Sequence, residues 1–221
     1  MNSNLTSDPG DPFDGSATVG DLDVQQLAAA FTHFRPRLRR MVKLRLDRRL
    51  QSRVDPSDVL QEAYLDILGR VARVQECRDA TGGELPLFLW LRLNTLQKLL
   101  EFHRRHLGVQ ARDVRREVTL HKGPLPHASS ATLAGYLLGQ LTSPSNAAVQ
   151  AERRFQLQEA LNALPLVDRE VLALRHFEEL SNQEVAEVLG LSKSAASNRY
   201  VRALGRLRDA LAEIPGFFNQ S

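Results

Sequence analysis

The chain has 221 residues and a formal net charge of +3, with 43% hydrophobic and 25% charged residues. This length suits one large domain or two small ones, and the composition excludes collagen, coiled coil and wholesale disorder. Apolar stretches fall short of the ~18 residues of a membrane-spanning helix, and no basic start of a secretory signal is present. The lone Cys77 excludes an internal disulfide and a cysteine zinc site. We therefore expect a cytoplasmic protein with no membrane insertion.

Charge is strongly segregated along the chain. Residues 1–25 contain five acids and no base. Two basic blocks follow: nine bases against Asp47 alone between Arg35 and Arg53, and five bases without an acid between Lys193 and Arg208. Either block alone fits a solvated helix face. Two such clusters, the second inside a recognisable motif, favour a nucleic-acid-binding protein.

The N-terminal half predicts a tail followed by a helical domain. Residues 1–23 are rich in Asp, Gly, Ser and Asn, which predicts a disordered acidic tail. Apolar residues at helical spacing then predict a helical domain over residues 24–112. Within its first helix, Pro36 should introduce a kink or start a new helix. The next helix should begin with Asp55 as its cap and Pro56 as its first residue.

The C-terminal half predicts a connector and a second helical domain. Residues 113–148 contain Gly and Pro at irregular intervals, which predicts a flexible linker. Within it, residues 133–141 could form a short helix or dock on another surface. Residues 149–214 are again periodic, and no strand pattern of useful length occurs. The predicted fold is all-α: two small helical domains joined by a flexible linker, the C-terminal one a helix-turn-helix. One apolar stripe of this domain is predicted to comprise Phe155, Leu157, Leu161 and Leu164.

Residues 181–192 predict a helix, a tight turn and the cap of a second helix. Ser181 and Glu184 have the spacing of a capping box at the start of the first helix. Gly190 stands where the chain must turn through positive φ, and Ser192 can cap the second helix. The buried face of the second helix should carry Ala196, Tyr200, Ala203 and Leu207.

The opposite face of the second helix carries short polar groups and cations, as a recognition helix in the major groove requires. Arg202 can contact guanine and Asn198 adenine. Lys193, Arg199 and Arg206 suit phosphates, which position a protein without reading sequence. An ordinary helical hairpin with a basic outer face is the alternative, but the caps, the glycine turn and the charged face agree on DNA binding. The predicted duplex-binding residues are Lys193, Ser194, Ser197, Asn198, Arg199, Arg202 and Arg206.

At this point the motifs resemble a known family. The helix-turn-helix, preceded by Leu164-Pro165 and by residues 168–175, resembles the −35-reading domain of bacterial sigma-70 family factors. Residues 58–64 resemble the polymerase-binding helix of that family. Residues 88–91, followed by Asn94 and by the basic run 103–105, resemble the helix that melts and reads the −10 element. Their order resembles the two-domain extracytoplasmic-function (ECF) subfamily.

The resemblance implies a sigma factor that directs core RNA polymerase to promoter DNA. Regulation would come from a separate anti-sigma inhibitor or from expression level. Ser197 stands where the family often has a cationic base reader, so a −35 preference cannot be carried over. The implied polymerase-binding residues are Asp58, Gln61, Glu62 and Asp66. The residues implied for the −10 strand are Arg92, Lys98, His103, Arg104 and Arg105.

Other functions are less consistent with the residues. An enzyme is not expected, because the chain lacks a phosphate-cradling glycine loop, a nucleophile elbow and a metal-ligand cluster. We accordingly expect no cofactor and no metal site. The main alternative is a helix-turn-helix regulator that binds duplex DNA without polymerase. A third possibility is a protein adaptor, such as a sigma-binding inhibitor, in which neutralising the face between Lys193 and Arg208 would have no effect.

Overall fold

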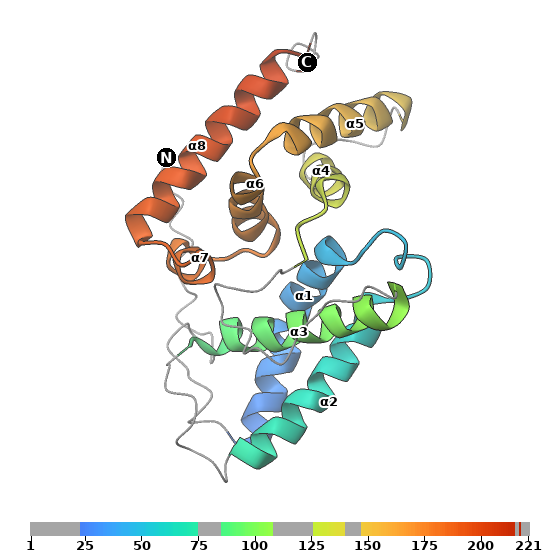
Figure 1. Ribbon diagram of the computed structural model, residues 1–221, viewed down its shortest axis with the longest axis vertical. Coiled ribbons are helices and arrows are strands. Elements are labelled where there is room, and N and C mark those ends of the chain that lie inside the picture. The colour runs from blue at the N-terminus through green and yellow to red at the C-terminus, as the bar shows by residue number, and fades with distance from the viewer. Residues whose placement is uncertain (1–22, 75–84, 108–125, 140–146, 215–216, 218–221) are drawn as a thin grey trace. The chain divides into compact units, whose positions relative to one another are not determined.

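A computed structural model describes residues 23–74, 85–107, 126–139, 147–214 and 217. The acidic tail up to residue 22, Cys77 and residues 108–125 and 140–146 of the chain lie outside the described residues. The described residues are helical, as predicted (Figure 1). The helices are α1 (Val24–Arg45), α2 (Pro56–Val74), α3 (Leu87–Leu107), α4 (Ser130–Gly139), α5 (Ala147–Ala163), α6 (Leu166–Leu172), a π-helical turn (Ala173–Phe177), α7 (Asn182–Leu189) and α8 (Lys193–Ala212).

The chain divides into two compact units. The first contains residues 1–42 and 46–125, and the second contains Lys43–Arg45 and residues 126–221. In the first unit, α2 packs along α3. Its largest fully buried side chains include Leu27, Leu38, Leu60, Ile67 and Leu91. This burial on three helices follows the 3.6-residue apolar pattern of each one.

The helix starts of the first unit depend on local side-chain bonds. Asp23 and Gln26 form a reciprocal capping box at the start of α1. At the start of α2, the Ser57 amide donates to the Asp55 carboxylate at 2.7 Å. Hydrogen bonds from Ser57 lower the pKa of Asp55. The predicted cap at Asp55 is therefore confirmed, whereas α1 runs through Pro36 as one helix, so the alternative of a new helix there is wrong.

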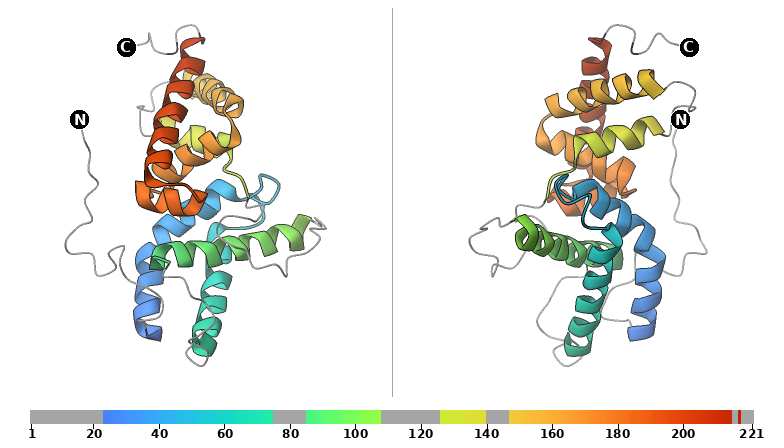
Figure 2. Two further views of the ribbon diagram at one scale, coloured as in Figure 1. Left: turned by 60° about the vertical axis from the view of Figure 1, so that its left-hand side comes forward. Right: turned by 90° about the vertical axis from the view of Figure 1, so that its right-hand side faces the viewer.

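The second unit contains a helix within the range predicted as a linker, where a short helix over residues 133–141 was one of two alternatives. α4 lies inside the range 113–148, yet residues 126–139 belong to the second unit. Leu133, Ala134 and Leu138 of α4 are buried, and α4 packs alongside α5 (Figure 2). The prediction of a flexible linker is therefore corrected for this stretch. The glycines suggested interruption, but Gly135 and Gly139 are accommodated inside the helix.

The apolar stripe of α5 also needs a correction. Leu157, Leu161 and Leu164 are buried, but Phe155 is 59% exposed. Leu157 and Leu161 are four residues apart and share a face. Phe155 precedes Leu157 by two residues, which turns it about 200° away around the helix.

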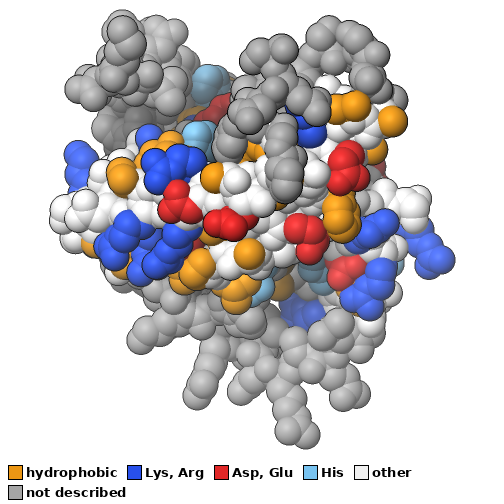
Figure 3. All heavy atoms as spheres, turned by 90° about the horizontal axis from the view of Figure 1, so that it is seen from above, with side chains coloured by type: hydrophobic (Ala, Val, Ile, Leu, Met, Phe, Trp, Pro, Cys, Tyr) orange, Lys and Arg blue, Asp and Glu red, His pale blue; other side chains and the backbone are white. Residues whose placement is uncertain are grey.

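The surface is mixed in character. In the view of Figure 3, Lys and Arg side chains lie among acidic and hydrophobic ones, without one continuous patch of a single kind. Among the helices that the structure describes, none is both long and apolar enough to cross a membrane.

Candidate nucleic-acid interface

The helix-turn-helix has the local geometry that its sequence predicts. Ser181 accepts a hydrogen bond from the Glu184 amide at 3.2 Å, and the Glu184 carboxylate accepts from the Ser181 amide at 2.7 Å. Gly190 ends α7 with φ of 63°, a left-handed conformation that costs glycine least. Ser192 caps α8 by accepting from the Ala195 amide. Each of these predicted caps is confirmed.

Contacts between α7 and α8 hold the motif together. Ala186 and Val185 of α7 are buried where the helices cross. The Asn182 side chain donates to the Lys193 carbonyl at 2.9 Å, so the start of α7 is bonded to the first turn of α8. This side-chain bond across the motif was not predicted. It restricts the motion of one helix relative to the other.

The α8 helix separates a buried face from an exposed one. Ala196, Ala203 and Leu207 are buried, as predicted, and Tyr200 is partly buried. The predicted duplex-binding residues that are exposed are Lys193, Ser194, Ser197, Asn198, Arg202 and Arg206, whereas Arg199 is partly buried. The Arg202 Nε donates to the Asn198 carbonyl at 3.3 Å, and its remaining donors are available to a ligand.

Two of these residues have an internal partner. Arg199 Nη1 donates to Asp168 Oδ1 at 3.1 Å, and Arg206 Nη1 donates to Asp168 Oδ2. Asp168 lies in the first turn of α6 and is only 1% exposed. One buried carboxylate therefore binds two cations that the sequence assigns to phosphates. The sequence analysis did not identify Asp168.

The helix-turn-helix also contacts the π-helical turn. The Tyr200 hydroxyl is 3.0 Å from His176 Nε2, and the Arg175 guanidinium lies over the Tyr200 ring, 5.5 Å from its centroid. Arg175 also donates to the Leu180 carbonyl at 2.6 Å. Burial, with the nearby charge of Arg175, lowers the pKa of His176. These contacts connect the middle of α8 to the residues just before α7.

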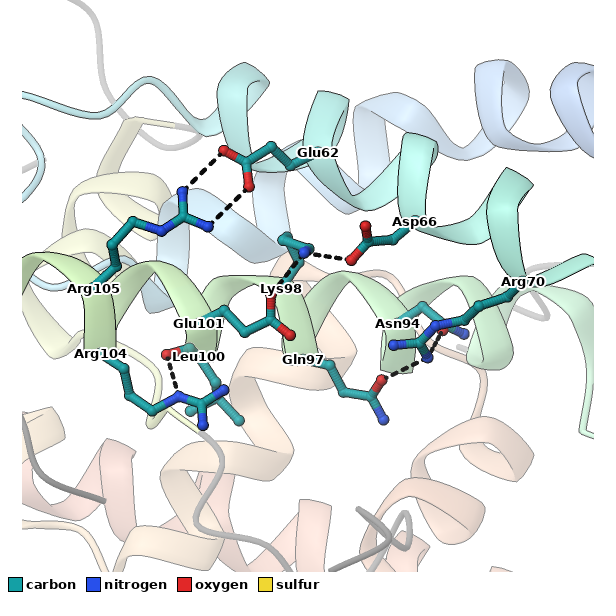
Figure 4. Close-up of polar contacts among 10 residues, drawn as sticks. All are labelled: Glu62, Asp66, Arg70, Asn94, Gln97, Lys98, Leu100, Glu101, Arg104 and Arg105. Carbon is teal, nitrogen blue, oxygen red and sulfur yellow. Dashed lines mark hydrogen bonds and ion pairs between the residues drawn. The ribbon is translucent and has the colours of Figure 1, made fainter. Parts of the chain in front are cut away.

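In the first unit, a row of polar contacts joins α2 to α3 (Figure 4). Lys98 of α3 forms ion pairs with Asp66 of α2 and, at 2.6 Å, with Glu101. Arg105 donates to both carboxylate oxygens of Glu62, at 3.3 and 3.4 Å. We call this row the α2/α3 seam; it comprises Glu62, Asp66, Arg70, Asn94, Gln97, Lys98, Glu101 and Arg105.

The seam brings together residues that the sequence assigns to two different partners. Glu62 and Asp66 are implied for polymerase, and Lys98 and Arg105 for the −10 strand. The structure pairs these acids with these cations. Burial lowers the pKa of Lys98, but hydrogen bonds to Asp66 and Glu101 outweigh it, so the net shift is upward. Lys98 therefore remains charged although it is only 7% exposed.

The other residues implied for the −10 strand differ in exposure. Arg92 is 3% exposed, and Arg104 is partly buried, with its Nε 3.4 Å from the Leu100 carbonyl. The Asp47 amide donates to His103 Nε2 at 3.1 Å, so this nitrogen carries no proton. Burial lowers the pKa of His103, which favours the neutral ring. A cationic role for His103 therefore requires the loss of this bond.

The remaining residues implied for polymerase binding lie on the surface. Asp58 and Gln61 are exposed on α2. Asp66 is also exposed, while Glu62 is partly buried. The structure thus places the four residues on one helix and uses two of them in the seam. Arg70, which donates to Asn94 at 2.9 Å and to Gln97 at 3.1 Å, is an additional seam cation that the sequence analysis missed.

Comparison with known proteins addresses the second unit directly. Residues 154–207, which span most of α5, all of α6 and α7 and most of α8, match the family described as Sigma-70, region 4. This part of the chain is therefore similar to region 4 of sigma-70 family proteins. The matched residues contain the helix-turn-helix and Asp168.

Curated relatives of the chain carry sigma-factor names. It is 29% identical over 157 residues to a probable RNA polymerase sigma factor RfaY of Xanthomonas campestris, an alignment that covers 71% of this chain and 34% of RfaY. It is 44% identical over 64 residues to the RNA polymerase sigma factor FliA of Pseudomonas aeruginosa, covering 28% of this chain and 26% of FliA. The chain thus spans about a third or less of the length of these relatives.

A solved structure also resembles the chain. It is the structure of CnrH in complex with the cytosolic domain of CnrY, with 17% sequence identity and a TM-score of 0.47. The similarity covers 88% of this chain and 93% of that chain.

Proposed function

We propose that this chain is a sigma factor of the ECF subfamily, which directs core RNA polymerase to promoters. The observation that carries the proposal is that the region 4 match coincides with a capped helix-turn-helix whose outer face is exposed and polar. Core RNA polymerase and promoter DNA are the proposed partners. The proposal assigns no reaction to the chain.

For the −35 duplex, we assign base reading to the N-terminal half of α8. Asn198 and Arg202 are exposed one turn apart, and amide and guanidinium groups can form paired hydrogen bonds with adenine and guanine. Lys193, Ser194 and Ser197 are exposed in the first turns of α8 and suit phosphates or sugar oxygens. α8 begins at a capped N-terminus, which also favours an anionic ligand.

For the first unit, we propose that α2 binds core polymerase and α3 captures the −10 strand. Asp58 and Gln61 offer an exposed polar surface on α2. Arg105 is exposed on α3, and its guanidinium lies 5.2 Å from the centroid of the Phe102 ring. Phe102 itself is buried, so the cation and not the aromatic ring is what this surface offers to the phosphates of a single strand. Arg92 and Lys98 are buried, so their use on DNA requires rearrangement of the seam.

The direct test is run-off transcription from a promoter library by core RNA polymerase, with and without the full chain. The proposal predicts stable association with core and new start sites that depend on the chain. Specific duplex binding by the free chain without core association would instead indicate a stand-alone regulator. Absence of both results would refute a role in promoter recognition.

The second test addresses the reading face of α8. Arg202→Ala should cost about 1–3 kcal/mol at one base position of the −35 element. Arg208→Ala is the matched control, because Arg208 is exposed on the same helix but pairs with Asp209 at 2.8 Å. Promoter-library transcription should show relaxed preference at one position for Arg202→Ala only. Equal effects of the two variants would contradict the assigned face.

A further inference from the structure

We infer that Asp168 is a positioning residue for promoter recognition: it sets the orientation of α8 through Arg199 and Arg206. This inference rests on the proposed function of α8, and it assigns to the two arginines an internal role in place of phosphate binding.

The first step is the burial of the carboxylate. Asp168 is 1% exposed, whereas Arg199 and Arg206 have side chains that are 37% and 54% exposed. A buried carboxylate without a partner is strongly unfavourable, so the fold requires Asp168 to remain bonded. The arginines are the partners that the structure supplies, one to each carboxylate oxygen.

The second step is the spacing of the two arginines. Positions 199 and 206 are seven residues apart, which is about two turns and about 10 Å along α8. Both lie on the side of α8 that faces α6, and α6 packs against α8. Two bonds from one carboxylate to positions about two turns apart restrict both the rotation of α8 about its axis and its tilt.

The third step is that the rest of this packing is apolar. Leu172 of α6 and Ala203 and Leu207 of α8 belong to one hydrophobic cluster. Hydrophobic burial is non-directional, so it tolerates a small rotation of one helix on another. Charge-assisted hydrogen bonds are directional, so the Asp168 contacts add to the α6–α8 packing a preference for one orientation that apolar burial does not supply.

The fourth step connects orientation with base reading. Asn198 directly precedes Arg199 in the chain, and Arg202 lies between the two anchored arginines. A recognition group must be held within about 0.5 Å and 10–20° of its working geometry. A rotation of α8 would therefore move Asn198 and Arg202 out of register with base edges while leaving the cations of the face near DNA.

The test compares specific with non-specific binding. The measured quantity is a specificity ratio: the affinity for a cognate promoter duplex, recovered from the transcription library, divided by the affinity for the same duplex with a scrambled −35 element. This ratio should be about tenfold lower for holoenzyme assembled with Asp168→Asn than for wild-type holoenzyme. Asp168→Glu should restore much of this ratio, since it keeps the charge. Asp209→Asn is the matched control: it removes an exposed acid from α8 and should leave the ratio unchanged.

The outcomes separate positioning from other roles. A purely structural role would reduce the folded fraction and lower both affinities together, with an unchanged ratio, which would overturn the inference. A role in masking cations would raise both affinities equally, which would also overturn it. Circular dichroism at the assay temperature verifies that Asp168→Asn is folded.

A second variant keeps the inference testable if Asp168→Asn does not fold. Arg206→Gln retains Arg199 as a partner of Asp168, and it should lower the specificity ratio without changing the salt dependence of duplex binding. A salt slope reduced by about 0.9, equivalent to one phosphate contact, would assign Arg206 to DNA and overturn the internal role. If wild-type holoenzyme showed no −35 preference, the proposed function itself would fail. A wild-type preference retained by both variants would refute only the inference.

Discussion

The cations of the α2/α3 seam and those of α8 come from similar helical patterns but have different surroundings. In the seam, Lys98 and Arg105 are paired with acids of the neighbouring helix. On α8, Lys193 and Arg202 are exposed, whereas Arg199 and Arg206 are anchored by Asp168. The basic residues on these helices therefore form two groups: those paired with an acidic side chain of the protein, and those available to a ligand. The α8 helix contains both groups, and the difference depends on acids that are distant in the sequence.

The largest effect is expected at the turn that defines the helix-turn-helix. Gly190→Ala should lower the free energy of unfolding by about 1–2 kcal/mol, because φ of 63° places a Cβ in the left-handed region. Urea denaturation followed by circular dichroism measures this change. A neutral result would show that the turn relaxes without cost, and the motif would then depend on packing more than on its caps.

The next effect concerns the seam. Replacing two acids, Glu62→Gln with Asp66→Asn, should release Arg105, while Lys98 stays paired with Glu101, and should raise the affinity of the full chain for a random single-stranded oligonucleotide severalfold. The salt slope should steepen by about 0.7 for each released cation. Fluorescence anisotropy at several salt concentrations measures both quantities.

A matched variant distinguishes release of the cations from a general change in charge. Asp58→Asn neutralises an exposed acid on the same helix that lies outside the seam. It should leave the salt slope nearly unchanged. Equal steepening by Asp58→Asn and by the double variant would mean that the ion pair with Glu62 does not mask Arg105.

A smaller change in the free energy of unfolding, opposite in sign to that of Gly190→Ala, is expected for a substitution within α8. Gly205 lies in the helix interior, and a Cβ built there would have no neighbouring atom within 4 Å. Gly205→Ala should therefore raise the free energy of unfolding by about 0.5–1 kcal/mol. Urea denaturation under the conditions used for Gly190→Ala provides the comparison, and a loss of stability would contradict the open space around Gly205.

The smallest effect is a pH dependence shared by the two regions. Burial lowers the pKa of His103 on α3 and of His176 in the π-helical turn from 6.5. The unfolded chain then binds protons more strongly, so their contribution to stability is present above pH 6.5 and is lost as the pH falls below it. Denaturation between about pH 5 and pH 7 should show this loss. His103→Gln and His176→Gln should each remove part of it, and unchanged pH profiles would contradict the burial argument.

Structural features that depend on residues close in the sequence were predicted more fully than those that depend on tertiary contacts. The caps at Asp55, Ser181 and Ser192 and the turn at Gly190 were predictable, because each depends on residues within one helical turn. The buried face of α8 followed from helical spacing. Phe155 was misplaced because two positions on α5 that look adjacent in the sequence lie about 200° apart around the helix.

For the candidate site, the sequence predicted which helix faces carry the polar and charged residues, but it did not predict which side chains pair with one another. Whether Arg206 is available depends on Asp168, which precedes it by 38 residues. Lys98 and Arg92 carry charge, which suggests exposure, but the packing of the first unit buries both. A short helix over residues 133–141 was one of two alternatives within the predicted linker, and α4 confirms it; its packing on α5, which makes it part of the second unit, was not predicted because its glycines resemble those of a linker.

The π-helical turn at Ala173–Phe177 has a consequence for the spacing of the residues on either side of it in the second unit. A π-helical turn accommodates one more residue than an α-helix of the same length. A related chain that stays α-helical here would accordingly be one residue shorter between Asp168 and Ser181 while keeping both residues in place. Deleting one residue within the turn is thus the length change that the domain should absorb most readily, and an insertion should be absorbed least.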